Sequence, residues 1–274
     1  MTILHSASPK IMGILNLTPD SFSDGGRYHQ LDQALAQAER MLSEGADILD
    51  IGGESTRPGS EPVSAQQQIE RVCPVIARLR ALHPEITISI DTMSSVVAEA
   101  AIQAGANIIN DVSGGDCDPR ILTVAAQQNV AIILMHMQGT PKTMQDNPYY
   151  EAVVEEVKTS LLQKVETALA AGIKAEKIAI DPGIGFGKRR QDNLDLLAHL
   201  SDFVSSGYPV LLGTSRKRFM GSICHVTEPE ALVTATAVTT ALGVMAGVTL
   251  FRVHDVRENR QAADIAWAIK QSQT

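Results

Sequence analysis

The chain has 274 residues, of which 44% are hydrophobic and 20% charged, the composition of an ordinary globular protein that can bury a sizeable core. These values exclude a disordered, collagen-like or low-complexity chain. Aromatic residues make up only 4%, so we expect an aliphatic core. The formal net charge of −8 argues against nucleic acid or acidic lipid as a partner, because both require a basic face that neutralises phosphate. An anionic ligand must therefore meet a local cluster of cations.

The three cysteines, Cys73, Cys117 and Cys224, lie far apart and show no CxxC spacing. This pattern favours neither a disulfide framework nor a zinc site. The N-terminal stretch MTILHSASPK has no basic segment followed by an apolar run, so no secretory signal is expected. We therefore expect a reducing, cytoplasmic setting.

Short aliphatic runs alternate along the chain with longer segments of helical period, which is typical of parallel strands joined by helical crossovers. No linker or change in composition divides the chain, so the pattern predicts an α/β fold, a single-domain (β/α)8 TIM barrel over residues 1–274. The predicted strands are Ile11–Leu15, Asp47–Ile51, Thr87–Ile90, Asn107–Ile109, Ala131–Met135, Lys177–Ile180, Pro209–Leu212 and Thr249–Val253. The predicted helices cover residues 30–44, 65–82, 94–104, 118–128, 149–171, 190–203, 229–245 and 257–271.

One segment has the length of a membrane span. Between Glu230 and Arg252 lie 21 consecutive uncharged residues, with a GxxxG spacing at Gly243 and Gly247. The segment is mostly Ala, Thr and Gly, and it divides at Gly247 into a helix and a strand, so we favour a barrel element and expect no membrane partner. A helix without charge on any face is buried on both sides. We therefore expect this helix to pack on the sheet inside and on a second subunit outside.

Polar residues follow the end of every predicted strand. Any single strand can end in a polar loop, but in a parallel barrel all these ends meet on one face, where the loops build the active site. Eight such ends, with several ionisable residues and two glycine-rich loops, therefore predict a binding site there. The residues concerned are Asn16, Gly52–Ser55, Asp91, Asn110, Asp111, His136, Asp181, Ser215–Lys217, Arg252 and His254.

Several of these residues have side chains suited to a flat, anionic ligand. The carboxylates of Asp91 and Asp181 can each accept two parallel hydrogen bonds from a ligand edge with neighbouring N–H donors, and Asn110 offers both a donor and an acceptor. Each of the three is also consistent with capping a helix or loop. No Ser-His-Asp spacing or acidic dyad marks a nucleophile, so we expect the site to act by binding and electrostatics.

The cations of the site are expected near the last two strands. The cluster Arg216–Arg218 follows the seventh strand, where barrels often bind phosphate, although a solvated basic turn is the alternative. Arg252 and His254 lie two residues apart, so their side chains share a face and require an anion or carboxylate if buried. The segment DPGIGFGK at 181–188 lets its backbone approach a ligand, but it is neither a Walker loop nor GxGxxG.

Seven strings together resemble the dihydropteroate synthase family, and they occur in the family's order from about residue 10 to residue 256. They are NLTPDSFSDGG, DIGGESTRPG, SIDT, NDVSGG, DPGIGFGK, GTSRKRF and RVHDV. The resemblance implies a TIM-barrel transferase of folate biosynthesis. Such an enzyme joins 6-hydroxymethyl-7,8-dihydropterin diphosphate to p-aminobenzoate, giving 7,8-dihydropteroate and diphosphate. The resemblance also implies Mg²⁺ as cofactor and a homodimer through the late helices.

The resemblance further implies a role for individual residues. Asp181 takes the 2-amino-4-oxo edge of the pterin, Asp91 and Asn110 hold other ring atoms, and Lys217 donates to the ring. Arg252 lies across the pterin face and reaches the diphosphate, a double use that a planar guanidinium permits. The remaining implied contacts are His254 and Asn16 with the diphosphate and its Mg²⁺, Thr56 with the diphosphate, Ser215, Arg216, Phe186, Phe22 and Pro58 on the p-aminobenzoate side, and Arg57 and Val253 within the substrate-binding set.

The implied mechanism is departure of diphosphate ahead of amine attack, with Asp24 facing the cation left behind. The catalytic group is then Lys217, Arg252, His254 and Asp24. Mg²⁺ follows from the resemblance alone, because one asparagine is a poor metal site and Mg²⁺ usually arrives with substrate phosphates.

Two other functions remain open. A pterin-binding methyltransferase domain shares the barrel and the pterin carboxylates but needs no diphosphate site. A non-catalytic pterin-binding paralogue keeps the ring contacts and loses loop residues. The intact TPDSFSDGG, STRPG and SRK segments favour the synthase over both.

Overall fold

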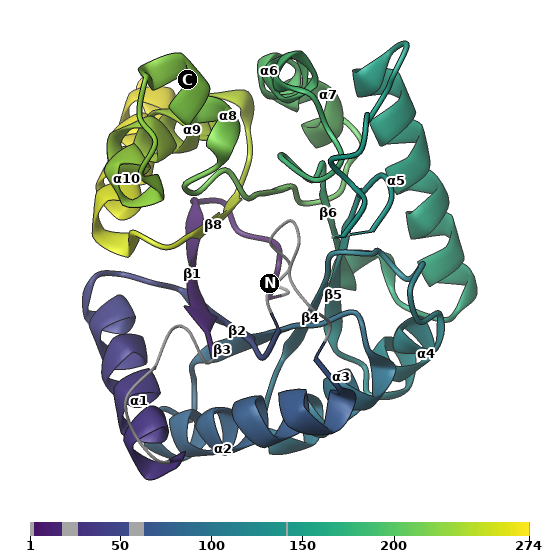
Figure 1. Ribbon diagram of the computed structural model, residues 1–274, viewed down its shortest axis with the longest axis vertical. Coiled ribbons are helices and arrows are strands. Elements are labelled where there is room, and N and C mark those ends of the chain that lie inside the picture. The colour runs from purple at the N-terminus through teal and green to yellow at the C-terminus, as the bar shows by residue number, and fades with distance from the viewer. Residues whose placement is uncertain (1–2, 18–26, 55–62, 141, 274) are drawn as a thin grey trace.

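The computed structural model describes residues 3–17, 27–54, 63–140 and 142–273, and these form a parallel barrel (Figure 1). Its eight strands are ordered β6-β5-β4-β3-β2-β1-β8-β7, and a bridge between Ile180 and Val210 joins the two end strands. The predicted (β/α)8 TIM barrel is confirmed. The strands are β1 Lys10–Asn16, β2 Ile48–Gly52, β3 Thr87–Asp91, β4 Ile108–Asp111, β5 Ala131–Met135, β6 Ile178–Asp181, β7 Leu211–Leu212 and β8 Leu250–Val253.

Helices surround the strands on the outside (Figure 1). They are α1 Arg27–Ser43, α2 Ala65–Leu82, α3 Ser95–Ala104, α4 Arg120–Gln127, α5 Val153–Ala170, α6 Arg190–Ala198, α7 Leu200–Val204, α8 Arg218–Cys224, α9 Val233–Ala246 and α10 Val256–Gln271, with short 3₁₀ turns η2 Ala175–Lys177 and η3 Pro229–Leu232.

Two helical predictions differ from the structure. The helix expected over 190–203 is divided at His199, whose backbone leaves the helical region and whose Nδ1 lies 2.8 Å from the Asp195 carbonyl oxygen. The basic stretch after β7, where no helix was predicted, continues into α8, which begins at Arg218. Both differences concern short segments, for which periodicity carries little information.

Side chains alternate between the two faces of the barrel wall, as the two-residue period of a strand requires. On β8, Phe251 and Val253 belong to the large core between the strands and the helices, whereas Leu250 belongs to the core inside the barrel. The inner core consists of Leu4, Met12, Ile48, Ile108, Ala131, Ile133, Ala179, Leu211 and Leu250. Two residues further along β2, β4, β6 and β8, the inward positions become polar, with Asp50, Asn110, Asp181 and Arg252. Aliphatic side chains thus fill the barrel interior, and a layer of polar and charged side chains lies above them at the carboxyl end of the barrel.

The uncharged segment forms η3 and α9, and Pro229–Ala246 is long and apolar enough to cross a membrane by length and composition. The helix ends at Gly247, which has φ +101° in the left-handed region, as predicted. Gly243 permits close packing, since a Cβ there would lie 2.8 Å from Phe251 Cε1. The glycine spacing is therefore explained by packing on β8 and by helix termination. On the outer side of α9, Leu242 remains 62% exposed.

Candidate active site

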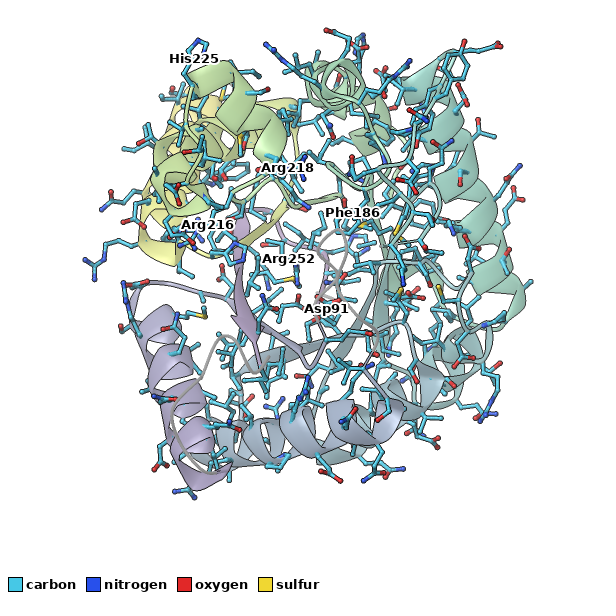
Figure 2. The ribbon with its side chains drawn as sticks, viewed as in Figure 1. Asp91, Phe186, Arg216, Arg218, His225 and Arg252 are labelled. Atoms are coloured by element: carbon cyan, nitrogen blue, oxygen red, sulfur yellow. The ribbon has the colours of Figure 1, made fainter. Side chains whose placement is uncertain are left out.

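A cluster of buried and partly buried charges lies at the carboxyl end of the barrel. The Arg252 guanidinium on β8 donates from Nε to Asp50 Oδ2 at 2.6 Å and from Nη2 to Asp91 Oδ2 at 2.5 Å. Asn110 Nδ2 on β4 donates to the same Asp50 oxygen at 3.1 Å. Figure 2 shows Arg252 and Asp91 over the middle of the barrel. Although burial opposes its charge, the carboxylates of Asp50 and Asp91 hold the pKa of Arg252 above its ordinary value.

The same carboxylates each keep one buried oxygen for which the described residues provide no hydrogen-bond partner. These atoms are Asp50 Oδ1 and Asp91 Oδ1. Burial raises the pKa of Asp91, an effect that the Arg252 charge opposes. Leaving a buried acceptor unpaired costs about 1–3 kcal/mol. A ligand with N–H donors would remove that cost, so the site is suited to a donor-rich edge.

Asp181 ends β6 and is 5% exposed. Its Oδ1 accepts the backbone N–H of Gly183 at 2.7 Å, which fixes the carboxylate at the start of the glycine-rich loop. Burial raises the pKa of Asp181 to about 6. Within the described part of the chain, Oδ2 accepts no hydrogen bond, and it lies 3.8 Å from the place of a Cβ on Gly213. One oxygen thus holds the loop, and the other can accept from a ligand.

Lys217 and Phe186 meet between the loops that follow β7 and β6. Lys217 Nζ lies 4.1 Å from the centre of the Phe186 ring, which is 9% exposed. Removal of Nζ from water, together with the Arg252 charge, lowers the pKa of Lys217 to about 8, against the opposing effect of Asp181 and Asp91. Gly185 has φ +83°, and a Cβ there would lie 3.0 Å from Lys217 Cδ. The glycine therefore leaves room for the lysine stem.

Ser215 and His254 form a pair at the ends of β7 and β8. Ser215 Oγ accepts the backbone N–H of His254 at 3.1 Å and lies 2.9 Å from His254 Nδ1. The Ser215 hydroxyl can accept from the backbone and also donate to Nδ1, and in that arrangement a neutral His254 carries its ring proton on Nε2. The pair therefore presents an N–H donor suited to an anion.

Arg216 is held away from the central cluster. Its guanidinium makes two hydrogen bonds to Asp255, from Nε at 3.0 Å and from Nη2 at 2.7 Å. Its backbone has φ +58°, a left-handed conformation that turns the chain between Ser215 and Lys217. The sequence placed Arg216 on the p-aminobenzoate side. The structure shows that its charge is paired with Asp255, and its place beside p-aminobenzoate stays a prediction.

The remaining predicted residues are placed as follows. Val253 is 1% exposed and packs in the core outside the barrel, so its side chain faces away from Arg252, and only its backbone remains for the predicted substrate contact. Asn16 ends β1 beside Gly52, where a Cβ would lie 3.4 Å from Asn16 Oδ1. The predictions for Phe22, Asp24, Thr56, Arg57 and Pro58 lie outside the described residues.

Sequence reasoning did not single out Asp50, which is fully buried and binds both Arg252 and Asn110. A signal was present, because Asp50 shares the inward face of β2 with Ile48 and Gly52. It also missed Lys188, a lysine that is only 3% exposed and is hydrogen-bonded to His136. That contact joins two different loops, so no local pattern reveals it.

Comparison with known proteins identifies the family to which the chain belongs. Residues 12–254 match the family described as pterin binding enzyme, and the chain belongs to that family. Several of the similar proteins are dihydropteroate synthases. The enzyme of Synechocystis sp. is 44% identical over 259 residues, spanning 94% of this chain and 89% of that protein.

Solved structures of dihydropteroate synthases agree with this assignment. The Xanthomonas albilineans enzyme with 4-aminobenzoic acid superposes with a TM-score of 0.90 at 43% identity, covering 96% of this chain and 94% of that one. The same enzyme with 7,8-dihydropteroate gives a TM-score of 0.86 at 40% identity, again over 96% and 94% of the two chains.

Proposed function

We propose that the chain catalyses the dihydropteroate synthase reaction, condensing 6-hydroxymethyl-7,8-dihydropterin diphosphate with p-aminobenzoate. The observation that carries the proposal is the barrel-mouth cluster, in which Arg252 joins Asp50 and Asp91 while one oxygen of each carboxylate stays unpaired among the described residues. A flat ring with adjacent N–H donors and an attached diphosphate matches both halves of this cluster. Family membership and the ligands of the solved relatives support the same reaction.

The carboxylates bind the pterin ring. The 2-amino-4-oxo edge of a reduced pterin carries neighbouring N–H groups, which Asp181 accepts through Oδ2. Asp91 Oδ1 and the Asn110 amide hold other ring atoms, and Lys217 donates to a ring acceptor. Asp91, Asn110 and Asp181 lie at strand ends, so the barrel wall fixes their spacing.

The cations bind and stabilise the leaving group. Arg252 keeps its charge, since the flanking carboxylates favour the guanidinium form, and its planar face can lie against the ring while its N–H groups reach the diphosphate. His254 adds an N–H donor from Nε2. Donors aimed at the charge that develops on departing diphosphate lower the barrier most in a dry site.

The reaction proceeds by departure of diphosphate ahead of amine attack. The bond between the methylene carbon and the diphosphate oxygen breaks, and its electron pair leaves with the diphosphate. Electron density from the reduced ring stabilises the methylene cation. The amine nitrogen of p-aminobenzoate then forms the new C–N bond and releases a proton to solvent. The protein's task is to orient the two substrates, stabilise the leaving charge and exclude water.

Mg²⁺ fits this site only together with the substrate. The described residues contain no group of three or more His, Cys, Asp or Glu side chains that could hold a metal. Asn16, at the end of β1, offers one amide oxygen, which suits an ion that brings its other ligands from the diphosphate and water. When bound, the ion would supply positive charge to the leaving diphosphate.

We also propose that the chain works as a homodimer in the cytoplasm, joined through α9 and α10. A groove between these helices is lined mostly by apolar side chains, among them Ala241, Leu242, Met245, Ile265 and Ile269. Leu242 is 62% and Ile265 65% exposed. A second copy of the same face would cover these side chains and the uncharged outer side of α9.

The deciding experiment follows diphosphate release from the pterin diphosphate with Mg²⁺, with and without p-aminobenzoate. The expected result is release coupled to formation of dihydropteroate, lost in the Lys217→Ala variant. Tight pterin binding without turnover would contradict the proposal and assign a non-catalytic pterin-binding role. Binding of the pterin ring with no preference for its diphosphate would favour a pterin-dependent methyltransferase instead.

A further inference from the structure

The loop after β6 lies in direct backbone contact with the segment after β5. A Cβ on Gly183 would lie 1.9 Å from the His136 carbonyl oxygen, and one on Gly187 would lie 2.4 Å from that of Gln138. Both glycines have positive φ, +68° and +62°. No side chain fits between the two backbones at these points, so the position of one loop determines that of the other.

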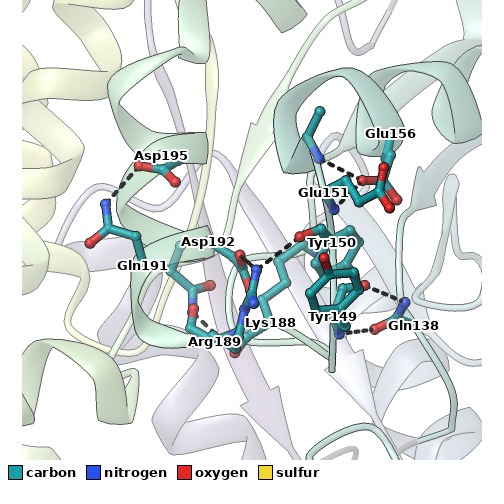
Figure 3. Close-up of polar contacts among 12 residues, drawn as sticks. Gln138, Tyr149, Tyr150, Glu151, Glu156, Lys188, Arg189, Gln191, Asp192 and Asp195 are labelled. Atoms are coloured by element: carbon teal, nitrogen blue, oxygen red, sulfur yellow. Dashed lines mark hydrogen bonds and ion pairs between the residues drawn. The ribbon is translucent and has the colours of Figure 1, made fainter. Parts of the chain in front are cut away.

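Side chains from the segment before α5 tie the two loops together further. The Tyr150 hydroxyl donates to the Gly187 carbonyl oxygen at 2.8 Å, and Gln145 Nε2 donates to the Gly185 carbonyl oxygen at 3.0 Å. In the other direction, Arg189 Nη2 donates to the Tyr150 carbonyl oxygen at 3.1 Å (Figure 3). The loop that carries Phe186 is therefore anchored on both sides.

Lys188 lies at the centre of this contact and is 3% exposed. Its Nζ lies 3.0 Å from His136 Nδ1 and 3.4 Å from the His136 carbonyl oxygen, and it donates to the Phe186 carbonyl oxygen at 3.1 Å. Among the described residues, no carboxylate oxygen lies within ion-pair distance of this ammonium. A buried cation bound only to neutral groups is expensive. Such an arrangement is retained where the cation positions something else.

The charges around the ammonium are consistent with a donor role. Burial lowers the pKa of Lys188 to about 7, with Asp181 and Asp192 opposing the shift and Lys217 reinforcing it. Burial and the neighbouring Lys188 charge lower the pKa of His136 to about 3, so the imidazole is neutral. A neutral ring with its proton on Nε2 accepts from Lys188 at Nδ1.

We propose that Lys188 is a positioning residue for the synthase reaction: it ties the Phe186 carbonyl to His136 at the end of β5 and so keeps the Phe186 ring against Lys217. The contact that transmits the effect is the 4.1 Å approach of Lys217 Nζ to that ring. This inference rests on the proposed function, in which Lys217 donates to the pterin. It assigns a role to a residue that touches neither substrate.

The test is the Lys188→Met variant, which keeps the length and apolar stem of the side chain and removes the ammonium. We expect kcat/KM for the pterin diphosphate to fall at least about tenfold, because one misplaced group in a preorganised site has this effect. We also expect the alkaline limb of the pH profile to move to higher pH. Once the ring no longer shields Lys217, water reaches its Nζ and the pKa rises toward the ordinary lysine value.

Arg80→Met is the matched control. Arg80 also binds backbone carbonyls, with Nη2 donating to the Gly105 oxygen at 2.8 Å, but it lies between α2 and the start of β4, at the amino end of the barrel. We expect this variant to lower the melting temperature while leaving kcat/KM and the pH profile unchanged. A purely structural role of Lys188 predicts the same behaviour for Lys188→Met.

A double-mutant cycle with Phe186→Leu tests the route of the effect. If Lys188 acts through Phe186, the two substitutions are not additive in kcat/KM. Additive effects, or a folded Lys188→Met enzyme with wild-type kcat/KM and an unmoved alkaline limb, overturn the inference. Lys188→Gln, whose shorter uncharged side chain ends in an amide NH₂ with two N–H donors, is measured beside it and carries the same expectations if Lys188→Met fails to fold. A wild-type chain without turnover overturns the proposed function and this inference together, whereas an active wild type restricts any failure to Lys188.

Discussion

Arg252 Nε lies 2.6 Å from Asp50 Oδ2, and Asp50 is fully buried between β1 and β3. The same oxygen accepts from Asn110 Nδ2 at 3.1 Å. One carboxylate therefore orients both a cation and an amide that the proposed function assigns to the pterin. Asp50 is the next inward-facing residue after Ile48 on β2, and it is buried away from solvent. It therefore acts on the substrate through Arg252 and Asn110.

Replacing Asp50 by Asn tests this relationship. The variant keeps the shape of the side chain but removes the negative charge beside the Arg252 guanidinium and offers it one acceptor only. We expect the Kd for the pterin diphosphate to rise about 10–100-fold, since breaking a buried charged hydrogen bond costs about 1.5–3 kcal/mol. Calorimetric titration measures the Kd directly.

Asp47→Asn is the control for Asp50→Asn. Asp47 directly precedes β2, at the amino end of the barrel, and its Oδ2 accepts the Ile11 N–H at 2.7 Å. It should lower stability without altering the Kd. An unchanged Kd in Asp50→Asn would show that Asp50 does not orient the binding groups.

A second prediction concerns the two oxygens of Asp181. In Asp181→Asn, the amide oxygen still accepts from Gly183, so the loop stays in place, but an NH₂ group replaces the oxygen that faces the pterin donors. The amide NH₂ then faces the N–H donors of the pterin. We expect the binding free energy of the pterin diphosphate to weaken by about 1–3 kcal/mol or more. Wild-type affinity in a correctly folded variant would refute the ring contact. Circular dichroism checks the fold.

The pH dependence of kcat/KM follows from three groups with shifted pKa values. Asp181, with its pKa raised to about 6, is an ionised acceptor only above that pH. Lys217, with its pKa lowered to about 8, is a charged donor only below that pH. The profile should therefore rise through about pH 6 and fall between about 7 and 8, where the ammonium groups of Lys188 and Lys217 lose their protons. A profile that stays flat up to pH 9 would contradict the role of the Lys217 ammonium.

Most of the fold could be predicted because the information is local. Aliphatic runs locate all eight strands to within one or two residues, and the buried Asp91, Asn110 and Asp181 and the partly buried Arg252 follow from the rule that strand ends meet on one face. Asp50 was not identified as a site residue because it lies inside an apolar run, one residue before the end of the predicted strand. The Val253 side chain lies in the outer core because adjacent residues on a strand face opposite sides.

Contacts between distant segments could not be predicted in this way. Nothing in the sequence near Arg216 shows that Asp255 neutralises it, because the two residues are brought together only by the pairing of β7 with β8. Lys188 and His136 meet for a similar reason, across the loops after β5 and β6. Such pairs depend on the closed barrel, whereas a sequence motif records only that a polar residue is present.

The dimer proposal predicts the effect of a charge on the outer face of α9. Leu242→Glu places a carboxylate in the apolar groove between α9 and α10, and burying it in an interface without a partner is strongly unfavourable. We expect wild-type protein to sediment as a dimer at micromolar concentration and the variant as a monomer. The control is Val96→Glu on α3, 48% exposed, which should stay dimeric. A monomeric wild type would contradict the proposed interface.

The last prediction separates the metal from the protein groups around it. If Mg²⁺ arrives with the diphosphate and takes only one ligand from the chain, Asn16→Ala should raise the Mg²⁺ concentration needed for half-maximal activity about tenfold, the low end of the loss expected for a ligand or its support. Saturating Mg²⁺ should then restore most of the turnover, because the remaining ligands come from substrate and water. Binding of the pterin without its diphosphate should be unaffected, since Asn16 lies at the end of β1 rather than among the ring acceptors. Loss of that binding as well would show that Asn16 supports the ring site, and the metal would then need another explanation.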